Sequence, residues 1–197
     1  MKTIILLALL FVGFALQAQE AITKSRKSQI GFIYSSLGDN VVSGDALIGG
    51  PSYDGDGFFT IGISYLKPLS NWLDLETGID YSEHKISVSN APMPGKVYNS
   101  RREMSLIHVP VALRAIFLKY FYVNGGMLLG MDISDNSPID SQGGIGALFG
   151  LGAKYDFNNG LGVFVNPYTK FHALLGFGLD NNRKRINESG FRFGVVF

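Results

Sequence analysis

The chain has 197 residues, of which 46% are hydrophobic, 13% aromatic and only 17% charged, and its formal net charge is +1. This length fits a single domain, and a composition so poor in charge excludes disordered and nucleic-acid-binding proteins, which need high net charge or basic clusters. The absence of cysteine excludes a disulfide scaffold, a thiolate metal site and a cysteine nucleophile.

The first eighteen residues have the layout of a secretory signal peptide. Lys2 provides the positive charge, residues 4–16 form an unbroken apolar run, and Ala18 offers a small residue for cleavage. The run is shorter than the roughly 20 residues of a membrane-spanning helix, so an uncleaved anchor is the minor alternative. We expect residues 1–18 to be removed and residues 19–197 to form the mature domain. Lys2 is the only charged residue removed, which leaves no net charge and argues against recruitment of polyanions by bulk charge.

The rest of the chain alternates apolar with small or polar residues, which is the period of a β-strand. The most apolar stretch, residues 106–133, is interrupted by charged residues, proline and glycine, which excludes a membrane-spanning helix. Pro167 falls on the outer face of one predicted strand, where it predicts a bulge. The eight predicted strands are residues 28–36, 58–67, a strand that begins at Trp72, 105–117, 120–133, 144–155, 161 to about 171, and 190–197.

The two faces of these strands predict a barrel in a membrane. One face is a continuous band of aliphatic residues, phenylalanine and methionine, as a lipid-facing surface requires. The other face is half glycine, alanine and serine, which suits the crowded interior of a narrow barrel, whereas a soluble sandwich carries lysine and glutamate there. Because backbone polar groups in lipid must be paired internally, the sheet has to close. The predicted fold is therefore all-β, an eight-stranded antiparallel up-and-down transmembrane β-barrel.

Short and long connections alternate along the chain. Short turns on one rim and long loops on the other are the pattern of bacterial outer-membrane barrels, and we expect both termini, which fall on the short-turn side, to be periplasmic. The short connections are residues 67–71, around 117–119 and 156–160, and the long ones are 38–57, 89–103, 134–143 and 178–189. Aromatic residues beside the short turns and at the C-terminus predict a girdle at the membrane–water boundary. They are Tyr65, Trp72, Tyr120, Phe121, Tyr155, Phe157 and Phe197.

The chain ends with apolar residues at alternate positions counted back from a terminal phenylalanine, namely Phe193, Val195 and Phe197. This ending resembles the C-terminal signal of outer-membrane barrels that is read by their insertion machinery. We therefore expect these three residues to act as a membrane-insertion signal and the barrel-insertion machinery to be a partner.

One hairpin resembles a known family. Residues 105–133 contain Val-Pro-Val at 109–111, a short aromatic turn, and Tyr-Val-Asn-Gly-Gly at 122–126 followed by Gly130. This pattern is similar to the central hairpin of the PorT-like small outer-membrane β-barrel family of Bacteroidetes-type bacteria. The resemblance implies an eight-stranded barrel in the outer membrane of a Gram-negative bacterium. It supplies no agreed activity and no catalytic residues, and the founding member's link to protein secretion does not transfer on a fold-level match.

Charged residues on the predicted inward faces are the first candidates for a site. A charge inside a barrel is costly unless it is paired. Because side chains just fill the interior of an eight-stranded barrel, we expect an ion-pair network that closes the lumen, and a narrow polar pore is the alternative. Arg114 is predicted to pair with both Glu76 and Asp80 on the neighbouring strand. The predicted network consists of Glu76, Asp80, His108, Arg114, Lys154 and Arg192.

No catalytic residue, cofactor or metal site is predicted. The chain has three histidines, His84, His108 and His172, and a lipid-modifying hydrolase would need one beside a serine and oriented by a carboxylate. Glu83 adjoins His84, but successive residues of a strand point to opposite faces, so this carboxylate does not orient that ring. The spacing of histidines and carboxylates fits no metal site, and the sequence DGDG at 54–57 is turn chemistry.

Two predicted outer loops are basic. Their side chains would reach the phosphates of lipopolysaccharide through charge-assisted hydrogen bonds, and a solvated rim is the alternative. These residues are Arg101 and Arg102 in one loop and Arg183, Lys184 and Arg185 in the other.

These features predict a non-enzymatic structural or interaction module of the outer membrane that acts through its extracellular loops. The alternatives are a lipid-A-modifying enzyme, a small channel or secretion-accessory barrel, and a soluble lipocalin-like barrel. The expected partners are outer-membrane lipid and lipopolysaccharide, the insertion machinery, and an unidentified extracellular or secretion partner, but no nucleic acid.

Overall fold

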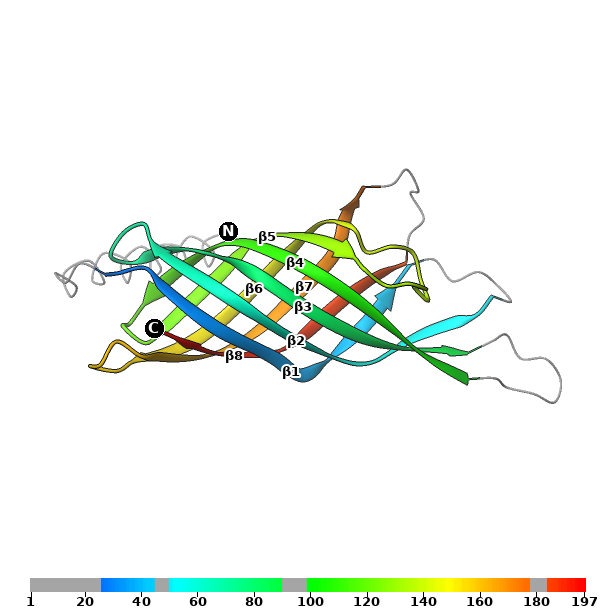
Figure 1. The fold of residues 1–197 in the computed structure, drawn as a ribbon, viewed down its shortest axis with the longest axis horizontal. Helices are drawn as coiled ribbons and strands as arrows, with labels where there is room; N and C mark the ends of the chain where they lie inside the picture. Colours follow the sequence, from blue (N-terminus) through cyan, green and yellow to red (C-terminus); the bar gives the residue numbers. More distant parts are fainter. Residues whose placement is uncertain (1–25, 45–49, 90–98, 178–183) are drawn as a thin grey trace, which may run out of the picture.

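The structure, a computed structural model, describes residues 26–44, 50–89, 99–177 and 184–197. Within these ranges the chain forms eight antiparallel strands in one closed barrel, each paired with its neighbours in chain order, with β8 paired to β1 (Figure 1). The predicted all-β barrel is therefore confirmed. No helix of the described ranges is long and apolar enough to cross a membrane. The strands are β1 (Gln29–Ser43), β2 (Ser52–Pro68), β3 (Leu73–Ser89), β4 (Asn99–Phe117), β5 (Phe121–Asp132), β6 (Gly144–Asp156), β7 (Gly162–Gly176) and β8 (Arg185–Val196).

One end of the barrel carries the three short turns, after β2, β4 and β6, and the C-terminus. The C-terminus and the start of β1 lie together at this end (Figure 1). There Ile30 N donates to Phe197 O at 3.0 Å, and Phe197 N donates to Ile30 O at 2.9 Å. We call this the short-turn end and the opposite end the loop end.

The strands extend further at the loop end than the alternation predicts, so parts of three predicted loops are strand instead. These stretches have few alternating apolar residues, and the sequence signal of a lipid-facing strand is therefore missing from them. Their backbone ladder nevertheless continues, with Asn40 paired to Glu188 and Ser87 paired to Arg101. The stretches concerned are residues 38–43, 52–57, 99–103 and 185–189.

The bulge predicted at Pro167 is wrong. Pro167 pairs with Phe191 of β8, and β7 keeps the same register with β6 on both sides of the proline. The proline removes one donor from the ladder without requiring an extra residue. The register shift with β6 lies beyond Phe171, where Ala173 has a left-handed φ of 45°. As a result, both His172 and Ala173 are buried in the lumen.

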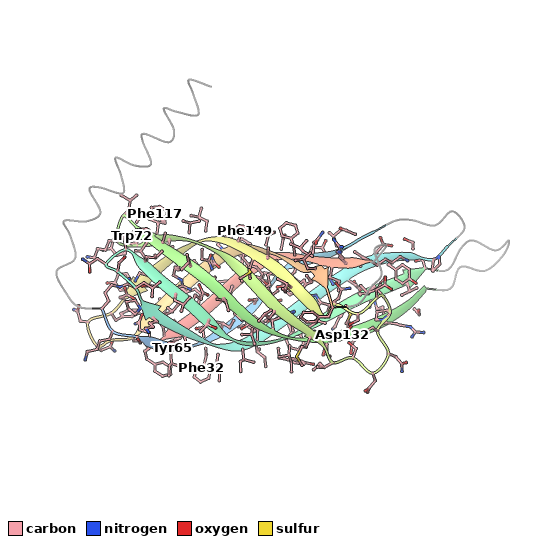
Figure 2. The ribbon with its side chains drawn as sticks, turned by 90° about the horizontal axis from the view of Figure 1, so that it is seen from above. Phe32, Tyr65, Trp72, Phe117, Asp132 and Phe149 are labelled. Carbon is pink, nitrogen blue, oxygen red and sulfur yellow. The ribbon has the colours of Figure 1, made fainter. Side chains whose placement is uncertain are left out.

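The outward face of the wall is an apolar belt. Phe32, Tyr65 and Phe149 project away from the ribbon (Figure 2), and the exposed fractions of Phe32 and Phe149 are 59% and 57%. Soluble monomers rarely expose such an extended apolar surface, whereas a lipid-facing band requires one. The belt includes Ile61, Ile63, Ile79, Leu113, Val123, Met127, Leu129, Met131, Leu151 and Val195.

The aromatic residues predicted as a girdle are all exposed. Trp72 and Phe117 mark the short-turn end in Figure 2. Nearby, the ring centroid of Tyr155 lies 6.2 Å from that of Tyr120 and 4.9 Å from that of Phe157. The rings therefore contact one another along the rim of the barrel. Aromatic side chains favour the membrane–water boundary, so this rim is where such a boundary is expected.

The lumen is filled by side chains in layers. Along β4 the buried residues change from apolar Met104 and Leu106 to polar His108. They continue through Pro110 and Ala112 to polar Arg114, and end with apolar Ile116. Toward the short-turn end lies the base cluster, Ile33, Leu66, Ile116, Tyr122, Phe164 and Val196. Toward the loop end lies the outer cluster, Ile86, Met104, Leu106, Ile139 and Ile186. The polar residues between the two clusters form the candidate site.

Candidate functional site in the barrel lumen

The inner polar layer, next to the base cluster, is centred on the carboxylate of Glu76 in β3. Its Oε2 accepts hydrogen bonds from Arg114 Nε at 3.1 Å and from Asn124 Nδ2 at 3.2 Å, and Arg114 Nη2 lies 3.0 Å away. Its Oε1 lies 2.7 Å from Arg192 Nη2. All four residues are buried. One carboxylate is therefore shared by two guanidiniums in a space shielded from water, where charge-assisted hydrogen bonds are strong.

Amide and aromatic side chains complete the inner layer. Arg192 Nη2 donates to Asn166 Oδ1 at 3.1 Å, and Asn166 Nδ2 donates to Asn124 Oδ1 at 3.3 Å. The Arg114 guanidinium lies over the ring of Tyr122, 4.2 Å from its centroid. This cation–π contact joins the network to the base cluster.

The strand register explains why Arg114 meets Glu76 but not Asp80. Arg114 is paired across the ladder with Asp74, two residues from Glu76 on β3. A long side chain reaches such a diagonal neighbour, whereas Asp80 lies six residues from Asp74, which is about 20 Å of strand. In the described part of the chain no ion pair joins Arg114 to Asp80, contrary to the prediction. Asp80 Oδ2 lies 3.7 Å from Lys170 Nζ instead.

Lys154 does not join this network, contrary to the prediction. Its Nζ lies 2.7 Å from Oδ2 of Asp156, two residues further along β6 at the short-turn end. The reason is height along the barrel, because Lys154 lies close to the turn and its ammonium reaches a half-exposed carboxylate there.

Asp74 has a partner that the sequence did not suggest. Arg26, ahead of β1, places Nη1 and Nη2 each 2.6 Å from one of its carboxylate oxygens.

The outer polar layer brings together residues from β3, β7 and β8. Oε2 of Glu188 lies 3.4 Å from Nε2 of His84 and 3.4 Å from Nε2 of His172. Oε1 of Glu188 accepts a hydrogen bond from the Tyr168 hydroxyl and lies 3.5 Å from Lys170 Nζ. All five side chains are buried.

His108 borders the outer layer. Its ring centroid lies 4.8 Å from that of His172, and its Nδ1 lies 3.4 Å from Ser82 Oγ. A serine beside a histidine is part of what a hydrolase needs, but a third group must orient the ring. No described residue forms a hydrogen bond with Nε2 of His108, and both Ser82 and His108 are fully buried. The pair therefore lacks the orienting group of a triad.

Sequence reasoning did not find the outer layer as a unit. His84, His172 and Glu188 lie on strands far apart in the sequence, so no local spacing connects them. For His84 and His172 the available signal was the alternation, because both fall on inward-facing positions in the loop-end half of their strands, whereas Glu188 lies in residues 185–189, where the alternation is missing. That signal shows which side chains enter the lumen but not which of them meet.

At the loop end, the basic residues of β4 are exposed. Arg101 places its Nε 2.6 Å from Oδ2 of Asp56, and 80% of its side chain is exposed. Arg102 is exposed as well. Both guanidiniums are therefore accessible to an anion from outside the barrel.

The basic residues near the start of β8 are placed differently. Lys184 Nζ lies 3.7 Å from the ring centroid of Tyr53. Arg185 is partly buried, and its Nε has no hydrogen-bond partner among the described residues. Arg183 lies outside the described residues.

The sequence matches, over residues 6–197, a family model described as outer membrane protein beta-barrel domain. Among solved structures, it is similar to the outer membrane protein OprG from Pseudomonas aeruginosa, with 13% identity, coverage of 85% of this chain and 95% of that chain, and a TM-score of 0.45. It is also similar to the translocator domain of autotransporter NalP from Neisseria meningitidis, with 10% identity, coverage of 100% and 97%, and a TM-score of 0.39. The NanC porin is 10% identical, with coverage of 87% and 99% and a TM-score of 0.27. No curated protein matches the chain.

Proposed function

Because the chain belongs to the family of outer membrane protein beta-barrel domains, and is thus a protein of the outer membrane, we propose that it is a sealed, non-enzymatic barrel that acts through its loop end. In this proposal residues 1–18 are a cleaved signal peptide, both termini are periplasmic and the loop end is extracellular. The short turns at the end that carries the C-terminus support this orientation. The hairpin at 105–133 supports a place among the PorT-like small barrels.

The observation that supports a sealed barrel is the filling of its lumen. The polar layers lie between the base cluster and the outer cluster, and their charged side chains are buried and form ion pairs with one another. The interior of an eight-stranded barrel is just wide enough for side chains to fill. With the interior occupied in this way, the loop end is the surface left for a partner. Each charged residue of the two layers is at most 3% exposed: Glu76, Asp80, Arg114, Lys170, Glu188 and Arg192.

We expect the purified barrel to produce no discrete conductance steps in planar lipid bilayers, because no continuous path of water crosses a lumen closed by two apolar clusters. Insertion is checked by heat-modifiable gel migration of the same preparation, with a porin as the positive control. Reproducible single-channel steps would support the channel alternative and contradict the proposal.

Lipid A mass spectra from cells with and without the protein test the enzyme alternative, and we expect the two spectra to be identical.

For the loop end we propose contact with outer-membrane lipopolysaccharide. Arg101 and Arg102 are exposed on β4, and guanidinium groups bind phosphates through paired, charge-assisted hydrogen bonds. An extracellular or secretion partner would use the same face of the barrel, since the lumen is filled.

We further propose that the terminal phenylalanine is read by the barrel-insertion machinery, and we expect Phe197→Ser to lower the amount of folded barrel severalfold. In the folded barrel the Phe197 ring faces outward with 57% exposure, the same fraction as Phe149 in the belt. Phe149→Ser is therefore the matched control, since it removes an equally exposed ring. Heat-modifiable migration in outer-membrane fractions measures the folded amount. Equal reductions for the two variants would mean that the terminal residue acts only as lipid-facing surface.

A further inference from the structure

We propose that His84, His172 and Glu188 form a binding site for one divalent transition-metal ion inside the outer polar layer. The residues come from β3, β7 and β8, and one potential ligand atom from each lies within 4.8 Å of the other two. The site is enclosed by the barrel and is independent of the role proposed for the loop end.

The distances between the ligand atoms suit a metal ion. Glu188 Oε2 lies 3.4 Å from Nε2 of each histidine. In a tetrahedral zinc site, bonds of roughly 2.0–2.2 Å place two ligand atoms about 3.3–3.6 Å apart. Two of the three separations therefore match a tetrahedral zinc site, and the third, between the two histidines, lies within 4.8 Å. At the same time, 3.4 Å is long for a direct hydrogen bond between a ring nitrogen and a carboxylate oxygen.

The ligand atoms are buried and have no hydrogen-bond partner. His84, His172 and Glu188 are at most 1% exposed. Among the described residues, no hydrogen bond reaches either ring nitrogen of the two histidines, or Oε2 of the glutamate. Buried polar atoms normally have partners, so three unpartnered groups that converge on one point require an explanation. A metal ion supplies it, because it accepts a lone pair from each of the three.

The surroundings of Glu188 fix the direction of its free oxygen. The Tyr168 hydroxyl donates to Oε1, and Lys170 Nζ lies 3.5 Å from the same oxygen. Both neighbours thus occupy Oε1 and leave Oε2 directed at the two histidines. Hydrogen bonds of this kind to the far side of a ligand group are typical of metal sites, where they hold the ligand in position.

The local charge also favours a cation. The outer layer contains two carboxylates, Asp80 and Glu188, with one ammonium, Lys170, between them. The inner layer has the opposite excess, because two guanidiniums share the carboxylate of Glu76. With neutral histidines, the outer layer therefore has one unbalanced negative charge, which offsets half of the charge of a divalent ion.

The donor set indicates the class of ion. Two imidazoles and one carboxylate with a fourth position open form a recurrent zinc environment, and imidazole also suits copper, nickel and iron. Calcium and magnesium prefer oxygen ligands and are disfavoured here. We therefore use zinc as the probe.

The test is to refold the full mature chain, without a polyhistidine tag, in the presence of zinc and to measure the metal that remains after chelator treatment and gel filtration. We expect about one zinc ion per chain, since a site enclosed between two apolar clusters exchanges slowly while metal on surface carboxylates is stripped. His172→Ala and Glu188→Gln should lower the zinc content at least roughly tenfold under limiting zinc. His108→Asn is the matched control, because it changes another buried histidine of the same region that is not among the three ligands, and it should retain zinc.

Heat-modifiable migration shows which variants fold, and cobalt loaded into the unmodified chain gives a readout that needs no variant. Strong visible absorption from four-coordinate cobalt would support the site. Three results would overturn the proposal. These are a zinc-refolded chain that holds essentially no chelator-resistant metal, folded ligand variants that bind as much zinc as the unmodified chain, and loss of zinc in His108→Asn equal to that in His172→Ala.

Discussion

We expect Glu76→Gln to lower the free energy of unfolding of the barrel by about 3–5 kcal/mol, the usual cost of removing one partner from a buried ion pair. The substitution keeps the size of the side chain and removes its charge, so Arg114 and Arg192 lose the carboxylate that both contact. Both guanidiniums are buried, and no other described carboxylate lies within ion-pair distance of either. The amide of glutamine also presents donors to groups that are themselves only donors.

Urea titration of the barrel in phospholipid vesicles measures this effect. Trp72 is the only tryptophan and lies at the short-turn end, so its fluorescence reports the membrane-inserted state. The matched control is Glu103→Gln, the same change at an exposed position of β4, which we expect to shift the free energy by less than about 0.5 kcal/mol. Equal urea midpoints for the two variants would mean that the Glu76 carboxylate does not hold the inner layer together.

The alternation of the sequence predicts the wall of the barrel because each wall residue faces either lipid or the lumen. Phe149 and Glu76 fall on the faces expected for them, and the short turns end the strands close to where the pattern stops. Residues at the loop end do not have lipid on one side and the lumen on the other, so the alternation of apolar and polar residues is weaker there. Residues 99–103 and 185–189 then read as loop although their ladders continue.

Which lumen residues meet cannot be read from the same alternation. Contact inside the barrel depends on height along the axis, which is set by the register of all the strands between two residues. Arg114 and Asp80 are both inward on neighbouring strands yet have different partners. His84 and His172 come together although their strands are not neighbours in the sheet. A single sequence gives the direction of each of these side chains and not its height.

The base cluster should depend most on Tyr122, and we expect Tyr122→Ala to lower the free energy of unfolding by about 3–5 kcal/mol, the range for removing a large aromatic side chain from a core. The ring is fully buried. It packs under the Arg114 guanidinium, with its centroid 6.3 Å from that of Phe164. Opposite it on β6 is Gly152, where a Cβ would overlap the phenol ring, so the wall itself is shaped around this side chain.

Tyr120→Ala is the matched control, because Tyr120 lies two residues earlier in the turn and is exposed at the rim. Its ring stacks on that of Tyr155 and leaves no internal cavity when it is removed.

The loss at Tyr122 should also include the cation–π contact that shields the Arg114 guanidinium, a contribution of roughly 0.5–2 kcal/mol. Combining Tyr122→Ala with Glu76→Gln should therefore give less than the sum of the two losses, since both changes act through Arg114. Urea midpoints in vesicles for the two single variants and the double variant decide this. Strict additivity would show that the base cluster and the inner polar layer stabilise the barrel separately.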